Sequence, residues 1–359
     1  MRRLQWRRIV ATAGAVLLVT LLTAVVRLLQ SHGVFATVTP GFAGACRTVP
    51  GPAGPADLVF DDQGKIVFVA ATDRRARRQP AAQDGIYAYA YAKAGARLEK
   101  LAGTPADFHP TGISLYRGPE GGLTLMAINR RADKTNAIAI FQVSYQNGMP
   151  RLAEVGSIGG GALVSPSAIA AVDEDRFYVV NDHAGSSALG RWLDDTLVLP
   201  GADIAYFDGI KFTMVANGLN TPGGAALSGD GRYLYVPQAY PRTLLTFERN
   251  PFTGRLSQAG ELFIPSNLDK ASVAADGAIW LGSHPKAFAT ARYRNHLTKP
   301  APSEIFRVGV KDGIPQTADL VYANSGAQIG ASSVGLAADG HLFIGSLYDA
   351  KILDCTLPQ

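Results

Sequence analysis

The sequence predicts an all-β fold, a six-bladed β-propeller preceded by one N-terminal transmembrane helix, from three observations. Six times along the 359-residue chain, a turn containing Asp or Gly is followed by a short apolar strand. These turns recur about every fifty residues, and a strand-and-turn repeat of this period is typical of propellers, where each repeat forms one blade. Further strands lie between the turns, and a long apolar segment lies near the N-terminus.

The N-terminal segment is expected to form a membrane anchor or signal-anchor. Residues 9–26 contain no charged side chain, and a helix of that length rises about 27 Å, close to the thickness of a hydrocarbon core. Arginines at positions 2, 3, 7 and 8 precede it, so we expect the propeller outside the cytoplasm, in the periplasm or the extracellular space. A cleaved signal peptide is the alternative, although the small residues at 43–45 lie far from the apolar run.

Three regions follow: residues 1–30 as the anchor, 31–55 as an extended linker with four prolines, and 56–359 as the propeller. The repeat turns are 61–64, 118–122, 173–175, 229–231, 276–277 and 339–340. Segments such as 85–90 and 137–141 alternate with period two, as half-buried strands do. Residues 285–302 lack this alternation and carry five basic residues. We expect them to form a long loop over one face of the ring.

The two cysteines, Cys46 and Cys355, flank the propeller region. A propeller closes by joining its first and last strands, and this closure brings these positions together. Export implies an oxidising compartment, so we expect a Cys46–Cys355 disulfide. Two unrelated buried thiols are the alternative.

Charge and motifs exclude several function classes. The net charge is +5, but the cluster at positions 74, 75, 77 and 78 lacks interleaved aromatic residues and is expected to be a solvated loop, with no nucleic-acid partner. The chain has no Gly-x-Ser-x-Gly elbow, phosphate-binding loop, dinucleotide fingerprint or closely spaced Cys/His zinc pattern.

Several local patches occur in a specific order, together with both cysteines. They are 57–58 (Asp-Leu), 110–114 (Pro-Thr-Gly-Ile-Ser), 181–183 (Asn-Asp-His), 224–235, 282–285 (Gly-Ser-His-Pro) and 321–323 (Val-Tyr-Ala). In these patches the chain resembles the paraoxonase/arylesterase family; gluconolactonase-like and strictosidine-synthase-like propellers are the nearest alternatives. The resemblance implies a six-bladed propeller with an uncleaved N-terminal helix, a disulfide joining its two ends, and calcium-dependent hydrolysis of aryl esters or lactones.

The resemblance also locates the family's calcium ligands, and most of them are replaced. The five side-chain positions of the catalytic ion fall on Ala56, Ser167, Gly223, Asp269 and Lys270. Only Asp269 retains a carboxylate, and Lys270 brings an ammonium. At the second, structural ion, Asp57 matches and Ile113 still offers its carbonyl, but Ala168 replaces an Asp. Calcium needs many oxygen ligands, so we expect no cofactor. Asp57 and Asp269 are the remaining metal ligands if an ion is retained.

The candidate catalytic residues are His109, His284 and Arg130. The family's histidine dyad falls on Thr111 and Arg130; His109 lies two residues before Thr111, on the same face of an extended segment. His284 matches a pocket histidine of the family. A structural loop histidine is the alternative for His109.

The candidate pocket residues are Asp57, Asp269, Lys270 and His183. We expect Lys270 to replace the calcium charge and to pair with Asp57 or Asp269, because a buried carboxylate needs a partner. An exposed turn is the alternative for Asp269 and Lys270, and a hydrogen-bonding corner at a strand end is the alternative for His183. His296 and His341 are expected at the surface.

Two functions are consistent with these residues. The first is ester or lactone hydrolysis of a small molecule, with an altered and calcium-poor pocket. The alternative is a catalytically lapsed propeller that binds a small molecule or a protein.

Overall fold

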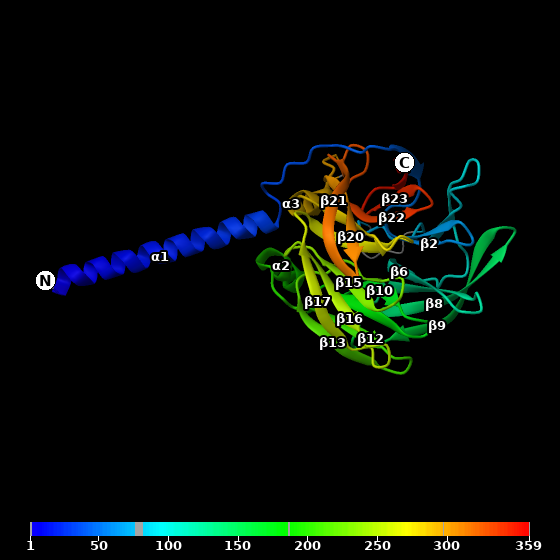
Figure 1. Ribbon diagram of the computed structural model, residues 1–359, viewed down its shortest axis with the longest axis horizontal. Helices are drawn as coiled ribbons and strands as arrows, with labels where there is room; N and C mark the ends of the chain where they lie inside the picture. Colours follow the sequence, from blue (N-terminus) through cyan, green and yellow to red (C-terminus); the bar gives the residue numbers. More distant parts are fainter. Residues whose placement is uncertain (1, 76–81, 186, 297, 359) are drawn as a thin grey trace.

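The computed structural model describes residues 2–75, 82–185, 187–296 and 298–358. Six four-stranded antiparallel sheets form the six blades of a propeller, and a long N-terminal helix, α1 (Arg2–Ser31), projects from it (Figure 1). This arrangement confirms the predicted fold class. The helix contains one apolar segment, Ile9–Ser31, long enough to cross a membrane, and a signal sequence has the same character.

The blades follow one another along the chain. The first has β2 (Pro55–Asp61), β3 (Ile66–Ala71), β4 (Gly85–Tyr89) and β5 (Leu98–Lys100); the second has β6 (Pro110–Arg117), β7 (Leu123–Arg130), β8 (Asn136–Gln146) and β9 (Met149–Gly159). The third has β10 (Pro166–Ala171), β11 (Phe177–Asn181), β12 (Ala202–Phe207) and β13 (Phe212–Leu219). The fourth has β14 (Ala226–Leu227), β15 (Tyr233–Gln238), β16 (Thr243–Arg249) and β17 (Leu256–Phe263). The fifth has β18 (Asn267–Val273), β19 (Ile279–His284), β20 (Ser303–Lys311) and β21 (Ile314–Asn324).

The sixth blade closes the ring with a strand from the N-terminal side. It contains β22 (Ser332–Ala338), β23 (His341–Ser346), β24 (Lys351–Thr356) and β1 (Ala45–Pro50). β1 pairs with β24 so that Cys46 lies opposite Cys355, and the two form the expected disulfide. The segment 31–55, which we expected to be an extended linker, therefore contributes the outermost strand of the last blade.

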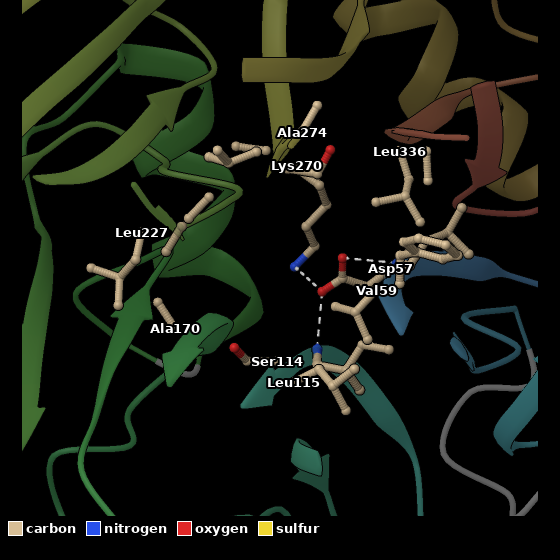
Figure 2. A pocket seen from close by; sticks show the side chains of 18 of the residues that line it. Asp57, Val59, Ser114, Leu115, Ala170, Leu227, Lys270, Ala274 and Leu336 are labelled. Carbon is tan, nitrogen blue, oxygen red and sulfur yellow. Dashed lines mark hydrogen bonds and ion pairs between the residues drawn. The ribbon is translucent and has the colours of Figure 1, made fainter. Parts of the chain in front are cut away.

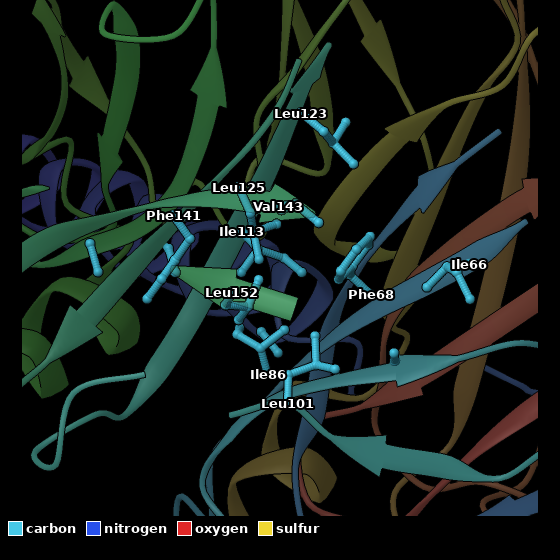
Figure 3. Packing of buried hydrophobic residues seen from close by; sticks show 14 of the residues in the cluster. Ile66, Phe68, Ile86, Leu101, Ile113, Leu123, Leu125, Phe141, Val143 and Leu152 are labelled. Atoms are coloured by element: carbon cyan, nitrogen blue, oxygen red, sulfur yellow. The ribbon is translucent and has the colours of Figure 1, made fainter. Parts of the chain in front are cut away.

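The turns and the core follow from the repeat. Gly231 and Gly340 have φ values of 68° and 76° in the predicted acidic turns, a conformation that glycine adopts at low cost. Apolar side chains pack between neighbouring blades. Figure 3 shows one such layer, in which Phe68 and Ile86 of the first blade meet Leu125 and Phe141 of the second. Each blade thus buries both of its faces against its neighbours.

Two short helices lie at one end of the ring. α2 (Ala188–Leu197) follows β11 and α3 (Ala287–Asn295) follows β19. Both strands run towards the end where the innermost strand of each blade begins, and we call this the helix end; the opposite end is the turn end. The interpretation of residues 285–302 as a loop was wrong over α3. Its buried residues, Thr290 and Tyr293, are three apart, a helical spacing that a search for period-two alternation misses.

The end of α1 also packs at the helix end (Figure 1). The Ser31 carbonyl accepts hydrogen bonds from Asn267 (2.7 Å) and Arg242 (3.3 Å). His32 is buried, with its Nε2 2.9 Å from the carbonyl oxygen of Asp195, and it stacks on Phe288. The apolar helix is therefore connected to the same end of the ring as α2 and α3.

Candidate active site

The innermost strands share an irregularity at the helix end that aims side chains at the axis. In β18 the register with β19 shifts between Leu268 and Ala271, so Asp269 and Lys270 have no partners in the ladder. In β2 the register shifts between Pro55 and Asp57. β-Bulges of this kind bend a strand and redirect its side chains. These bulges bring Lys270 and Asp57 together.

Lys270 and Asp57 form a buried ion pair. The distance from Lys270 Nζ to Asp57 Oδ2 is 3.7 Å, and the two side chains are 6% and 10% exposed. Lys270 also donates a hydrogen bond to the carbonyl of Ser167. Asp57 accepts hydrogen bonds from the backbone N–H groups of Leu58 (3.1 Å) and Ile113 (3.0 Å). The expected pairing of Lys270 with a carboxylate is present, and the exposed-turn alternative is wrong.

Burial has the largest effect on the pKa of the Asp57 carboxyl. It raises the pKa of Asp57, and the ammonium of Lys270 opposes that shift. The pair contributes no net charge when both groups are ionised. The pair is buried at the axis end of the site.

Asp269 and His284 form a second pair, next to the first. Asp269 Oδ2 and His284 Nε2 lie 3.7 Å apart, and both atoms are buried without a hydrogen-bond partner in the described structure. The His284 ring also interacts with the backbone of Ala331. In the tautomer that carries its proton on Nδ1, Nε2 is an acceptor, and two acceptor atoms then face each other.

Burial reverses the usual order of the two pKa values in this pair. Burial raises the pKa of Asp269 to about 6, against the charges of Lys270 and Arg74. Burial lowers the pKa of His284 to about 4. At neutral pH the carboxyl is mostly ionised and the imidazole is neutral. Pairs of titratable groups whose environments shift their pKa values in this way are typical of acid–base catalysis.

His183 and Arg130 belong to a hydrogen-bonded corner at the ends of β11 and β7. His183 Nδ1 lies 2.8 Å from Asp182 Oδ1, and its Nε2 lies 3.0 Å from Asp195 Oδ1. Arg130 donates two hydrogen bonds to the carbonyl of Pro166 and lies 3.6 Å from Asp182. Both ring nitrogens of His183 are therefore occupied, as the alternative of a strand-end corner predicts.

Charge balance in this corner favours the ionised forms. Burial disfavours charge on His183, but the hydrogen bonds to Asp182 and Asp195 outweigh it and raise its pKa to about 9. Burial also acts against ionised Asp182, but His183, Arg130 and Ser165 together lower its pKa. The corner is a salt-bridge network that connects α2, through Asp195, to the ends of the strands.

Arg74 is a site residue that the sequence did not indicate. We expected the cluster of arginines at 74–78 to be a solvated loop, and this was wrong for its first two members. Arg74 donates to the carbonyls of Gly54 (3.3 Å) and Thr72 (3.4 Å), and its charge acts on Asp269 and Asp57. Arg75 lies over the rings of Tyr293 and Tyr348, 5.0 and 4.9 Å from their centroids. Positions 77 and 78 lie outside the described residues.

The remaining histidines do not contact the Asp269–His284 pair. His109 is buried, and its Nδ1 forms a hydrogen bond with Asp84 Oδ2 at 2.6 Å. Its Nε2 lies 3.1 Å from Asp107 Oδ1 but without hydrogen-bond geometry, so Asp84 is the carboxylate that fixes the ring. His341 is not a free surface residue as expected, because it lies 2.7 Å from Asp354 and stacks on Phe343. His296 is exposed, as predicted.

The donor set at the positions implied for calcium does not fit a calcium ion. Ser167 directs its hydroxyl to the carbonyls of Val180 (3.2 Å) and Pro222 (3.0 Å). A side chain at Gly223 would meet Asp269 Oδ1 at 2.5 Å. The ammonium of Lys270 lies against the Asp57 carboxylate, and in the part of the chain that the structure describes no three His, Cys, Asp or Glu side chains form a metal-binding group. A hard divalent cation needs several oxygen ligands, which these residues do not supply.

Comparisons with known proteins agree with the fold and with the resemblance. The sequence model of the Arylesterase family matches residues 91–357. Human (Homo sapiens) serum paraoxonase/arylesterase 2 is 29% identical over 253 residues, which cover 70% of each chain. Mechanosensory abnormality protein 6 of Caenorhabditis elegans is 27% identical over 255 residues, 70% of this chain and 66% of that protein. A luciferin-regenerating enzyme shares the fold, with a TM-score of 0.54 and 11% identity over 88% of this chain and 95% of that one.

Proposed function

Because the chain belongs to the arylesterase family, whose model covers residues 91–357, we propose that it hydrolyses small carboxylic esters or lactones with Asp269 as the general base. The observation that supports this most directly is the pair of buried acceptors, Asp269 Oδ2 and His284 Nε2, that face each other at 3.7 Å without a partner. A water molecule between them donates one proton to each and keeps a lone pair for attack on a carbonyl carbon.

The proposed reaction has two proton transfers, and both pass through Asp269. As water attacks the carbonyl, Asp269 takes its proton, and the carbonyl oxygen acquires a negative charge. When that intermediate collapses, Asp269 returns the proton to the departing alcohol oxygen, which in a lactone is the ring oxygen. A base with a pKa near 6 suits this role, because it is ionised at neutral pH and still basic enough to accept a proton.

A fixed cation takes the place of a metal in this proposal. Arg74 acts on Asp269 electrostatically, and its positive charge stabilises an oxyanion that forms beside Asp269. The charge of Lys270 is already balanced by Asp57. Since the donor set does not fit calcium, we propose that turnover does not require it.

The test measures hydrolysis of phenyl acetate and of a γ-lactone by the full-length protein in detergent, with calcium and with a chelator. We expect equal rates in both, and kcat/KM rising with pH through about 6 as Asp269 ionises. Asp269→Asn should lower kcat by about 100-fold or more, whereas the matched change at the exposed Asp319, Asp319→Asn, should have no effect. Tight calcium binding with loss of activity on chelation, or an unchanged rate in Asp269→Asn, would refute this mechanism.

A binding function is the second candidate, because Lys270 and the His183 corner are engaged in structural ion pairs. One relative, mechanosensory abnormality protein 6, is named for a phenotype and not for an activity. If the wild type and Asp269→Asn both leave a broad panel of esters and lactones at the buffer rate, the binding function replaces the enzymatic one.

We further propose that α1 anchors the propeller in a membrane, outside the cytoplasm. The segment Ile9–Ser31 is long and apolar, with residues 9–27 exposed, and the disulfide fits an exported protein. Exposed apolar side chains on α2, such as Leu189 and Trp192, lie at the end of the ring where α1 terminates. This placement orients the helix end, with Asp269, towards the lipid surface.

A further inference from the structure

A second cavity lies along the axis, on the turn-end side of the Lys270–Asp57 pair. Its volume is about 420 Å³, within the range of small-molecule sites. The later residues of all six innermost strands line it, and Asp269 and His284 are not among them. We call it the tunnel cavity. It is therefore distinct from the proposed catalytic pair.

Small side chains create this space. Alanines from four different blades, including Ala170, Ala226, Ala271 and Ala337, line the wall together with Val59 and Leu336. The lining is mixed, with more apolar than polar surface, so it suits a small molecule with an apolar body and one polar end.

Hydrogen-bond donors gather at the closed end of the cavity. Figure 2 shows the Lys270 ammonium beside Asp57, and Ser114 near Leu115 on the same side of the cavity lining as the second blade. The ammonium of Lys270 has three N–H groups, of which one is directed to the Ser167 carbonyl and one faces Asp57. Ser114 Oγ accepts a hydrogen bond from the N–H of Ala171 (3.0 Å), so its own proton is available for donation. A ligand at this end needs an acceptor atom.

The charge of the ligand's acceptor group decides whether a carboxylate or a carbonyl oxygen suits this site. Lys270 and Asp57 already neutralise each other, so a ligand carboxylate would bring an unpaired charge into a buried site, which is costly. At the other end, Asp62 and Asp339 line the cavity, but each lies beside a cation, Arg117 and Lys65 respectively, so this end adds little net charge. A carbonyl oxygen accepts the same hydrogen bonds without adding charge.

We propose that the tunnel cavity binds a neutral, apolar small molecule with one carbonyl oxygen, which accepts hydrogen bonds from Lys270 and Ser114. This site is additional to the hydrolytic one and does not depend on it. The ligand enters from the turn end, opposite to the end where α1 and the catalytic pair lie.

The test titrates full-length protein in detergent micelles with 2-heptanone and with heptanoate at pH 8, by calorimetry, with protein-free micelles as the blank. We expect saturable 1:1 binding of 2-heptanone and at least tenfold weaker binding of heptanoate. Ala226→Leu should abolish ketone binding by filling the cavity, and Ser114→Ala should weaken it severalfold. The exposed control Ala153→Leu and the helix-end variant Asp269→Asn should bind as the wild type does.

Three results would overturn the proposal. The first is non-saturable uptake that is equal in the wild type and in Ala226→Leu. The second is equal or tighter binding of heptanoate. The third is loss of ketone binding in Asp269→Asn, which would place the ligand at the catalytic pair. None of these depends on whether the protein hydrolyses esters.

Discussion

Replacing Lys270 with Met should destabilise the propeller through a carboxylate that loses its partner. The side chain of Lys270 is 6% exposed and that of Asp57 is 10% exposed, so solvent cannot replace the lost ammonium. Removing one member of a buried ion pair costs about 3–5 kcal/mol. Asp57 keeps two backbone hydrogen bonds, which place the loss at the low end of that range. We therefore expect Lys270→Met to lower the free energy of unfolding by about 3 kcal/mol at pH 8.

The stability difference between the wild type and Lys270→Met should depend on pH. Burial already raises the pKa of Asp57, and removing the ammonium that opposes this shift raises it further. A carboxyl with a raised pKa in the folded state stabilises that state when it is protonated, and this stability is lost as the pH rises through the folded pKa. The difference between wild type and Lys270→Met should therefore shrink from pH 8 to pH 5.

Denaturant unfolding of the full chain, followed by tryptophan fluorescence, measures these differences. The exposed control Lys311→Met should change stability by less than about 0.5 kcal/mol. Adding Asp57→Asn to Lys270→Met should recover at least half of the loss, because it removes the unpaired charge. A loss below about 1 kcal/mol at pH 8, or a double variant less stable than Lys270→Met, would show that the pair is not a buried charge pair.

Three further predictions concern the rest of the chain. Replacing both Cys46 and Cys355 with Ser should lower stability by up to about 5 kcal/mol, because the disulfide constrains a long loop in the unfolded chain; two free thiols in peptide maps of the exported wild type would contradict this. The pKa of His183 is raised to about 9, so its contribution is complete below pH 6.5 and is lost as the pH rises through 9; wild-type stability should fall between pH 7 and pH 10 by about 2–3 kcal/mol more than that of His183→Gln. The protein should stay in the membrane pellet after alkaline carbonate extraction, and a chain that starts near Cys46 and washes off with salt would argue against the anchor.

The sequence was sufficient for the fold because the repeat is periodic. Acidic and glycine turns at fixed intervals, such as those at Gly231 and Gly340, predicted the blades, and ring closure predicted the partner of Cys46. The helix α3 was missed because its two buried residues lie at a helical spacing within a strand-rich chain.

The site was predicted only in part. Lys270 was predicted to pair with Asp57 or Asp269 because a buried carboxylate needs a cation, and the structure shows that Asp57 is the partner. The position of Arg74, beside the carbonyls of Gly54 and Thr72, depends on tertiary contacts that a periodic pattern does not predict. The occupation of both nitrogens of His183 depends on α2, which brings Asp195 to it across twelve residues of chain. Contacts of this kind arise from the placement of loops and not from a local pattern.

The closure of the sixth blade has a mechanical consequence. Tension applied to α1 first loads the hydrogen bonds of Ser31 and His32 at the helix end and the bridge between Gly41 and Ala323. Once these contacts break, it passes to β1, the outermost strand of that blade. Hydrogen bonds alone would let such a strand peel away one pair at a time. The bond between Cys46 and Cys355 lies in the second register pair of the two strands, counted from the end that receives the load. A pull on the N-terminal helix is thus transferred to β24 through a covalent link, and the ring opens only if that link is reduced or the remainder of the sixth blade leaves with it.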